Sequence, residues 1–374
     1  MAGIYIHIPF CKQACFYCNF HFSTSLQYTN EFVQSLVKEI ELKKKKLNSS
    51  PISTLYFGGG TPSILSKIEF KEVINKLNES IDLSQLIEFT IEVNPDDITK
   101  DKLEFWLENG VNRLSIGTQS FRESDLKLMN RAHSGIEAFK SIQLAQEAGF
   151  SNISIDLIYG IPGLKNTNWI ENLERAVSLN IPHVSSYCLT VEEKTALAHL
   201  IKTQKIQIPD EELASEQFLI MIDYLEKHGI HQYEISNFSK IGMESKHNKS
   251  YWSGEIYHGL GPGAHSFNGE NRYWNISNNQ QYFKSIEQGI IPEEIETLSL
   301  ENKFNELIMT SLRTREGIEM KRMEKLFSTD IISAFEKNIS KWVNSGKIIK
   351  LENQYLLSKE GRFFADGIAS DLFI

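Results

Sequence analysis

The sequence predicts an α/β fold: a partial (β/α)6, TIM-like barrel followed by a small C-terminal helical domain of winged-helix-like form. The main observation is that six short β-rich runs alternate with helical stretches over roughly the first 235 residues. Such alternation is typical of βαβ units and a parallel sheet. Several helices also carry start and stop signals. An open, doubly wound sheet is the alternative that this pattern leaves.

The six expected strands begin beside the N-terminus, and each gap between them leaves room for a helix. They are Ile4–Ile8, Thr54–Phe57, Ile87–Val93, Arg113–Ile116, Ile153–Leu157 and His183–Tyr187. Between strands, Thr99 can cap a helix that ends at Asn109-Gly110, and Ser134 with Glu137 forms a capping box. In a barrel of this kind, the chemistry is expected at the C-terminal ends of the strands.

The chain is expected to divide into three parts. Residues 1–235 form the barrel core. Residues 236–297 include a stretch rich in Gly, Asn, Tyr and Trp, which suits an ordered but irregular covering segment. Residues 298–374 contain helical runs followed by two short strand-like runs, so we expect a compact accessory domain there.

Composition and charge argue against two classes of protein. The formal net charge is −9 and the sequence pI is about 5.7, whereas a nucleic-acid-binding protein usually has a basic face. No run approaches the roughly 18 apolar residues that a transmembrane helix needs. The N-terminal residues also lack the pattern of a signal peptide. We therefore expect a cytoplasmic protein that binds no nucleic acid.

Three of the four cysteines, Cys11, Cys15 and Cys18, fall within eight residues, and Cys188 is remote. A disulfide framework would need more cysteines for a chain of this length. The spacing C-x3-C-x2-C places three thiolates on one short loop, where each can bind a different iron of a cubane cluster. The fourth iron would stay open to a small chelating molecule. A zinc site completed by His7 or His21 is the alternative.

This cysteine spacing, preceded by Tyr5-Ile-His7-Ile-Pro9-Phe10, resembles the radical S-adenosylmethionine (SAM) superfamily. The chain looks most like the branch that contains oxygen-independent coproporphyrinogen III oxidase and the heme chaperone HemW. The resemblance covers nearly the whole chain. It implies a [4Fe-4S] cluster whose open iron binds the amino and carboxylate groups of SAM, while the protein positions and shields this cofactor pair. It also implies a C-terminal domain that covers the barrel opening.

Other motifs match positions that lie near the cofactors in this superfamily. A carboxylate at a strand end, such as Glu92, suits a ribose or amine contact. Asp156 interrupts an apolar strand near its C-terminal end, where burial of a lone acid is costly. The cofactor-binding residues that the resemblance implies are Tyr5, Gly59, Gly60, Thr61, Glu92, Gln119, Arg131 and Asp156.

The segment from His247 to Trp252 resembles the H-N-x-x-Y-W motif that is associated with heme binding in the chaperone branch. A neutral imidazole is a good axial ligand for heme iron, and aromatic side chains offer flat surfaces to the macrocycle. His258 and His265 are rival ligands. In the oxidase, a further cysteine follows two residues after the third cysteine, whereas this chain has Phe20 there.

The resemblance therefore implies a heme chaperone that binds a [4Fe-4S] cluster, SAM and heme and inserts heme into respiratory proteins. The expected partners are heme, heme-accepting respiratory apoproteins and a bacterioferritin-type donor, and a homodimer is left open. The alternative is an oxygen-independent coproporphyrinogen III oxidase, which forms protoporphyrinogen IX by radical oxidative decarboxylation. A third class is another radical SAM enzyme, such as a methylase. No catalytic residue is assigned, because the sequence leaves open whether SAM is cleaved productively.

Overall fold

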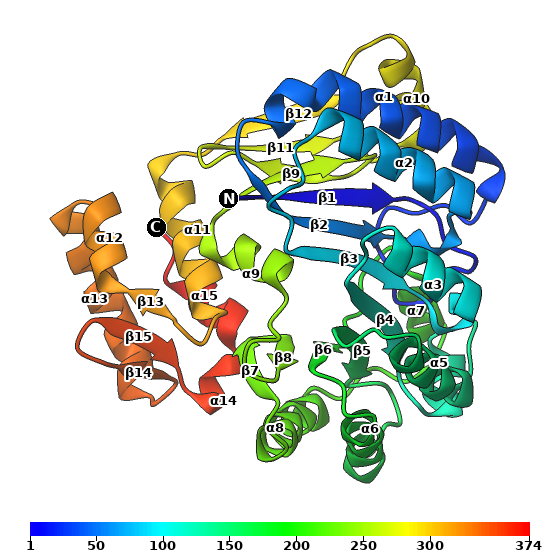
Figure 1. The fold of residues 1–374 in the computed structure, drawn as a ribbon. Coiled ribbons are helices and arrows are strands. Elements are labelled where there is room, and N and C mark those ends of the chain that lie inside the picture. The colour runs from blue at the N-terminus through cyan, green and yellow to red at the C-terminus, as the bar shows by residue number, and fades with distance from the viewer.

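The structure is a computed structural model that describes all 374 residues. Its largest feature is a sheet with the strand order β12-β11-β10-β9-β1-β2-β3-β4-β5-β6-β8-β7. The six central strands are parallel and curve into a partial barrel with helices on its outer side (Figure 1). They are β1 (Ala2–Ile8), β2 (Ile52–Gly59), β3 (Glu88–Val93), β4 (Arg113–Gln119), β5 (Ile153–Tyr159) and β6 (His183–Cys188). The predicted partial (β/α)6 barrel is confirmed.

The helices of the barrel half follow the strands, as the sequence predicts. They are α1 (Thr29–Leu47), α2 (Lys67–Ser80), α3 (Lys100–Glu108), α4 (Glu123–Leu128), α5 (Gly135–Glu147), α6 (Asn166–Ser178), α7 (Ala196–Lys202) and α8 (Glu211–Lys227), with 3-10 turns η1 (Leu26–Tyr28), η2 (Pro62–Ile64) and η3 (Pro95–Asp97). Both predicted helix starts are confirmed. The Thr99 side chain accepts a hydrogen bond from the Lys102 amide, and Ser134 and Glu137 form the reciprocal capping box.

Side chains on the barrel strands alternate between an apolar outer face and a polar interior. On β1, Ile4, Ile6 and Ile8 are fully buried in the core between sheet and helices. Tyr5 and His7, the alternate residues, point inward, where their side chains are hydrogen bonded to each other at 3.2 Å. Because successive side chains of a strand point to opposite faces, polar side chains of β1–β6 lie together inside the barrel.

Residues 236–297 differ from the irregular covering segment that the sequence suggested. After β7 (His231–Glu234) they form β8 (Asn237–Ser239), α9 (Lys246–Ser253), β9 (Ile256–Leu260), β10 (His265–Phe267), β11 (Asn271–Asn275), α10 (Asn279–Glu287) and β12 (Glu293–Thr297). Strand β9 pairs in parallel with β1, so this segment extends the sheet. These strands are short and separated by glycine turns, such as Gly261 and Gly263 at positive φ. Their periodicity is therefore hard to detect in the sequence.

The C-terminal residues form a second apolar core. The predicted helical runs are confirmed as α11 (Leu300–Leu312), α12 (Met320–Leu326) and α13 (Thr329–Asn344), and the strand-like runs as β14 (Ile348–Lys350) and β15 (Gln354–Leu357). The structure adds β13 (Ile318–Glu319), α14 (Lys359–Arg362) and α15 (Ala365–Asp371), which the sequence analysis did not predict. No helix in the structure has both the length and the apolar character needed to cross a membrane.

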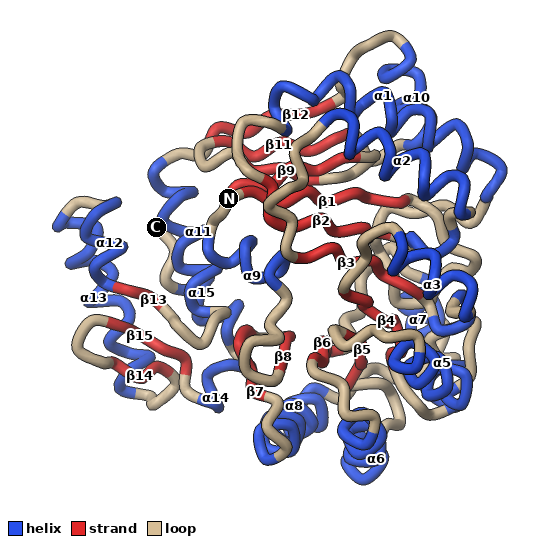
Figure 2. Tube along the Cα trace, in the orientation of Figure 1, coloured by secondary structure: helices blue, strands red, loops and turns tan.

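The C-terminal module does not cover the barrel opening, contrary to what the resemblance implied. It joins the barrel at β7, where the Ile235 amide donates to the Arg313 carbonyl at 2.9 Å. It lies beside α9 and near the start of β1 (Figures 1 and 2). Helix α9 itself contacts Thr54 and Glu88, near the starts of β2 and β3. The module therefore lies at the N-terminal end of the barrel, and the C-terminal ends of the strands remain free of it.

Candidate functional site

The three clustered cysteines lie on one loop between β1 and α1, which we call the cysteine loop (residues 9–23). Two hydrogen bonds close its base: the Cys11 amide donates to the Ser23 carbonyl at 3.0 Å, and the Ser23 amide donates to the Pro9 carbonyl at 2.9 Å. All three thiols are free and half-buried. The loop therefore has a fixed base and presents three thiols.

The tip of the cysteine loop is held by the segment that follows α4. Asn130, at φ 57°, donates from its side-chain amide to the Ala14 carbonyl at 2.8 Å, and its own carbonyl accepts from the Gln13 side chain at 2.9 Å. The Phe16 amide donates to the Met129 carbonyl at 3.1 Å. A left-handed backbone outside glycine is strained and is retained where its surroundings hold it. These bonds order the loop independently of any bound group.

A cavity of about 450 Å³ lies between the cysteine loop and the C-terminal ends of the strands. Most of the site residues predicted from the sequence line it together, although they come from separate strands and loops. These are Cys11, Cys15, Cys18, Gly59, Gly60, Thr61, Glu92, Gln119, Arg131 and Asp156. The cavity is therefore large enough for a small ligand beside the three thiols.

Two carboxylates face this cavity from neighbouring parts of the barrel. Glu92 accepts hydrogen bonds from the Tyr56 hydroxyl at 2.8 Å and from the Gly59 amide at 3.1 Å. Burial raises the pKa of Glu92 to about 7 and that of Asp156 to about 6. Asp156 also accepts from the Ser115 hydroxyl at 3.3 Å. Two half-buried acids that form no salt bridge suit a ligand that carries positive charge.

Arg131 links the cavity wall to the cysteine loop. One guanidinium nitrogen lies 3.1 Å from the Cys15 sulfur, and another donates to the Asn94 side chain at 2.7 Å and to the Gly117 carbonyl at 2.8 Å. Nearby, Gln119 adopts φ 63° at the end of β4. A planar guanidinium held this firmly is suited to a carboxylate ligand and to a thiolate.

The glycine run packs closely against the chain itself. The Gly60 amide donates to the Ile8 carbonyl at 2.8 Å, and a Cβ at Gly60 would lie 2.5 Å from the Phe10 carbonyl oxygen. Gly59 has φ +109°, and a Cβ there would lie 2.5 Å from the His7 ring. Only glycine allows this contact between the end of β2 and the base of the cysteine loop.

Tyr5 and His247 do not line the cavity. The His247 side chain is inside the barrel with only 1% of its surface exposed. Its Nδ1 lies 2.8 Å from the Thr54 hydroxyl, and its Nε2 lies 2.9 Å from the Tyr251 hydroxyl. Burial and the charge of Arg113 lower the pKa of His247 to about 3, so its ring is neutral. The structure thus differs from the expectation of an open axial ligand, because both ring nitrogens already have partners.

The rival histidines lie in two different environments. His258, on β9, is buried, and its Nε2 has no hydrogen-bond partner. His265, on β10, is exposed, and its ring stacks on Trp274 with 6.0 Å between ring centroids. His265 is therefore the rival histidine that an incoming ligand can reach without rearrangement of the barrel.

Sequence reasoning missed several residues that shape the site. Tyr56 and Asn94 bond to Glu92 and Arg131, Arg113 places a buried positive charge in the barrel interior, and Tyr187 lines the cavity. The signal that could have found most of them is the period of two within each strand. In Thr54-Leu-Tyr56-Phe-Gly58, for instance, every second residue is polar or small.

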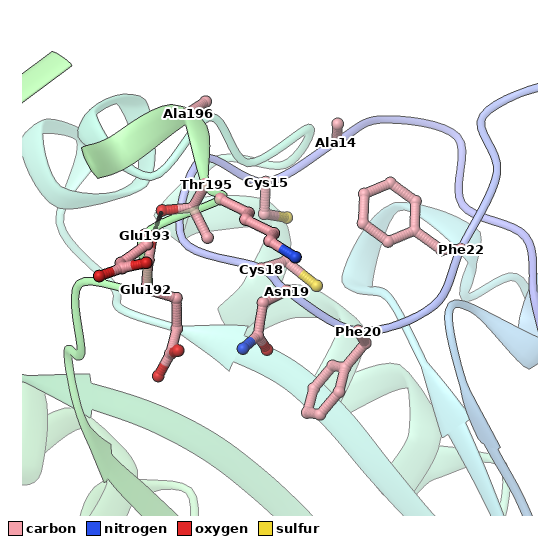
Figure 3. A pocket seen from close by; sticks show the side chains of 11 residues that line it. Ala14, Cys15, Cys18, Asn19, Phe20, Phe22, Glu192, Glu193, Thr195 and Ala196 are labelled. Atoms are coloured by element: carbon pink, nitrogen blue, oxygen red, sulfur yellow. Dashed lines mark hydrogen bonds between the residues drawn. The ribbon is translucent and has the colours of Figure 1, made fainter. Parts of the chain in front are cut away.

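A second hollow, of about 640 Å³, lies on the outer side of the cysteine loop. Figure 3 shows the segment from Ala14 to Phe22 facing residues 192–196. The side chains of Cys15 and Cys18 lie in the space between the two segments. Phe20 is 69% exposed here. This hollow shares Cys15, Cys18, Asn19, Phe20 and Glu192 with the cavity described above, so the two spaces adjoin at the cysteine loop.

The three thiols fit a cluster held on one side by the protein. No group of three or more His, Cys, Asp or Glu side chains is arranged to hold a single metal ion. A cubane cluster does not need such convergence, because each thiolate binds a different iron. Arg131 beside Cys15 and the Thr61 hydroxyl, 3.5 Å from the Cys11 sulfur, supply hydrogen-bond donors to sulfur, as is usual around such clusters.

Comparison with known proteins agrees with this site. The model of the radical SAM superfamily matches residues 5–176, and the HemN C-terminal domain matches residues 298–364. A heme chaperone HemW of Bacillus subtilis is 35% identical over 371 residues, which cover 98% of both chains. The chain belongs to the HemW family of radical SAM proteins. Membership in the radical SAM superfamily implies a [4Fe-4S] cluster and SAM as cofactors.

Two further relatives are similar to this chain over nearly its full length. A mitochondrial radical S-adenosyl methionine domain-containing protein 1 of Danio rerio is 30% identical and matches 100% of this chain and 87% of its own. The coproporphyrinogen III oxidase HemN of Escherichia coli, described as a radical SAM enzyme, superposes with a TM-score of 0.87. This match covers 100% of the present chain and 90% of HemN at 22% identity, so it demonstrates the shared fold.

The raised pKa of Glu92 predicts that this carboxyl contributes less to the stability of the ligand-free protein as pH rises. The native state holds the Glu92 proton more tightly than the unfolded chain, whose glutamate pKa is about 4.3. The contribution of Glu92 to the unfolding free energy therefore falls as pH rises from about 5 to about 7 and levels off above the native pKa, whereas buried histidines with lowered pKa values, such as His247 and His258, contribute in the opposite direction. The test is therefore the difference between two apoproteins in thermal denaturation: the melting temperature of Glu92→Gln relative to that of the wild type should rise by a few degrees between the lower and the upper end of this range.

The matched control for this prediction is Glu104→Gln, on the exposed side of α3. It should leave the pH dependence of the melting temperature unchanged. If the melting temperatures of wild type and Glu92→Gln depend on pH in the same way, the pKa of Glu92 in the folded protein is that of an ordinary glutamate.

Proposed function

We propose that this protein is a cytoplasmic heme chaperone that binds a [4Fe-4S] cluster through Cys11, Cys15 and Cys18, binds SAM beside it, and inserts heme into respiratory proteins. The observation that carries the proposal is the near full-length match to a heme chaperone at 35% identity. The cavity supports it, because three thiols, two acids and one arginine surround a space of about 450 Å³.

The cavity residues have complementary roles toward SAM. When bound, the cluster and SAM together supply electron transfer and radical chemistry. Arg131 would bind the ligand carboxylate, and ionised Glu92 would accept from the ligand ammonium group. Gln119 and Asp156 would contact the adenosine part, and Gly59, Gly60 and Thr61 would support the methionine part. Ligand charge beside Glu92 and Asp156 favours their ionised forms, so SAM binding should strengthen as pH rises through about 6 to 7.

Heme binding is the part of the proposal with two rival ligands. Ligation by His247 would require one of its ring nitrogens to give up its present partner, Thr54 at Nδ1 or Tyr251 at Nε2. His265 is exposed beside Trp274 and needs no such change. The proposed partners are heme-accepting respiratory apoproteins and a bacterioferritin-type heme donor, and the proposed assembly includes a homodimer as one option.

The deciding experiment combines a heme titration with a test for porphyrinogen oxidation. The purified chain is reconstituted anaerobically with iron and sulfide and titrated with heme, which is followed in the Soret region. Parallel samples receive coproporphyrinogen III, SAM and a reductant. The proposal predicts saturable heme binding and no protoporphyrinogen.

Two single variants, His247→Ala and His265→Ala, identify the ligand in the same titration. Loss of the Soret shift in one of them, with the other unchanged, assigns the axial histidine. Formation of protoporphyrinogen without saturable heme binding would reject the chaperone function and establish the oxidase instead.

A further inference from the structure

Three aromatic rings stack inside the barrel between α9 and the cavity. Tyr5 and Tyr56 are register partners on β1 and β2, with ring centroids 6.0 Å apart and planes 29° apart. The ring of His247, from α9, lies 5.0 Å from that of Tyr56 and 6.4 Å from that of Tyr5, both at under 30°. We call Tyr5, Tyr56 and His247 the aromatic column.

The column is bonded at both of its ends. At the cavity end, the Tyr56 hydroxyl donates to Glu92 at 2.8 Å. At the other end, His247 is held by the hydroxyls of Thr54 and Tyr251, at 2.8 and 2.9 Å. A shift of His247 would therefore be passed through one stacked ring to the carboxylate that faces the cavity.

The contacts of two glycines show that the aromatic column is tightly packed. A Cβ at Gly58 would lie 2.8 Å from the Tyr56 ring and 3.0 Å from a Glu92 carboxylate oxygen. A Cβ at Gly3 would lie 3.0 Å from the His247 ring. Such tight packing transmits displacement instead of absorbing it.

Helix α9 fixes the position of His247 from the start of the barrel. The buried carboxylate of Glu88, the first residue of β3, accepts from the Lys246 amide at 2.8 Å and from the His247 amide at 2.9 Å. A carboxylate at a helix N-terminus satisfies free amides and interacts well with the helix dipole. The helix with the His247–Trp252 motif is thereby anchored to the strand that carries Glu92.

From these contacts we propose that Tyr56 and His247 are positioning residues that hold the Glu92 carboxylate from beneath, so that α9 controls how strongly the cavity binds a ligand ammonium group. Where that ligand is SAM, this inference rests on the proposed function. His247 would then act on the cofactor site at the C-terminal ends of the strands, although α9 contacts the C-terminal module at the other end of the barrel.

The charged and titratable groups that surround Glu92 determine how the proposal is tested. They are Tyr5, Tyr56, Tyr187, Tyr251, Asp156 and Arg113. The Tyr56 hydrogen bond favours the ionised form of Glu92. Tyr56→Phe removes this bond and keeps the stacked ring, so it should raise the pKa of Glu92 and loosen its carboxylate.

The test measures SAM binding by equilibrium dialysis against pH, on full-length protein reconstituted with its cluster. Tyr56→Phe should retain wild-type iron and sulfide content, weaken SAM about tenfold near pH 7, and move the acid limb of the binding curve to higher pH. His247→Phe should shift the curve in the same direction. The matched control is His183→Phe, because His183 is equally buried and bonded to Ser154 and Tyr233; it should leave SAM binding unchanged.

A readout without ligand separates this inference from the proposed function. Infrared titration of the apoprotein, with Glu92→Gln as the reference that assigns the band, follows the Glu92 carboxyl directly. A higher midpoint in Tyr56→Phe supports the positioning role even if the wild type binds no SAM, in which case only the proposed function fails. Unchanged midpoint and unchanged SAM affinity in Tyr56→Phe would overturn the inference, as would equal weakening by His183→Phe.

Discussion

Replacing Cys15 with alanine is expected to abolish assembly of the iron–sulfur cluster. Each cysteine of the loop would hold a different iron, so loss of one thiolate leaves two protein ligands for the whole cluster. Cys15 also lies 3.1 Å from Arg131, so its loss removes the thiolate with the strongest hydrogen-bond support. Anaerobic reconstitution followed by iron and sulfide analysis, with visible absorption near 400 nm, should give full loading for the wild type and almost none for the variant.

Cys188→Ala is the matched control for this loss, because Cys188 also lines the cavity but lies on β6, away from the loop. It should load the cluster as the wild type does. A wild type that takes up no iron and sulfide but releases zinc on chelation would instead support the zinc alternative.

Glu39→Ala is expected to have the largest effect on stability. Glu39 is fully buried on α1, where it pairs with Lys43 at 2.8 Å and accepts from the Tyr282 hydroxyl at 2.6 Å and from the Gly261 amide at 2.8 Å. Removal of Glu39 leaves the buried Lys43 ammonium with Glu293, at 3.5 Å, as its one carboxylate partner, and loss of one member of a buried ion pair costs about 3–5 kcal/mol. Denaturant unfolding of the apoprotein should show a loss of this size, because these bonds attach α1 to α10, which carries Tyr282, and to the turn after β9, which carries Gly261.

Two variants test whether charge pairing is the cause. Glu41→Ala removes an exposed acid on α1 that pairs with Lys76 on α2, and it should change stability little. The double variant Glu39→Met with Lys43→Met removes both charges and should recover much of the loss, because apolar residues often replace a buried pair without penalty. A double variant as unstable as Glu39→Ala would assign the effect to the lost bonds to Tyr282 and Gly261.

The sequence analysis located most of the cavity, since its residues lie in local motifs at the ends of predicted strands. The cysteine spacing, the glycine run and Glu92 all depend on short stretches of sequence. In a parallel barrel, the C-terminal ends of successive strands meet at one opening. Asp156 lies at such a strand end, whereas Arg131 follows α4 and was expected near the cysteines only because of the family resemblance; the structure places both at the cavity.

The interpretation of His247 shows where the same reasoning falls short. A motif on a predicted loop suggested an accessible ligand, but the residue lies on a helix that enters the barrel from its N-terminal end. Its partners Thr54 and Tyr251 are separated from it by very different distances in sequence, and nothing in the local pattern pairs His247 with Thr54. Burial and bonding of a polar side chain depend on which segments pack around it, so they appear only in the assembled structure.

The sequence by itself determined the barrel, the cysteine loop and the family, because periodicity, caps and motif spacing are local properties. The tertiary structure decided that residues 236–297 extend the sheet, that the C-terminal module lies at the start of the strands, and that Tyr56 and His247 support Glu92. These features depend on contacts between residues far apart in the chain. Such contacts form only where complementary surfaces meet after the elements have folded, and the order of residues within one element does not encode them.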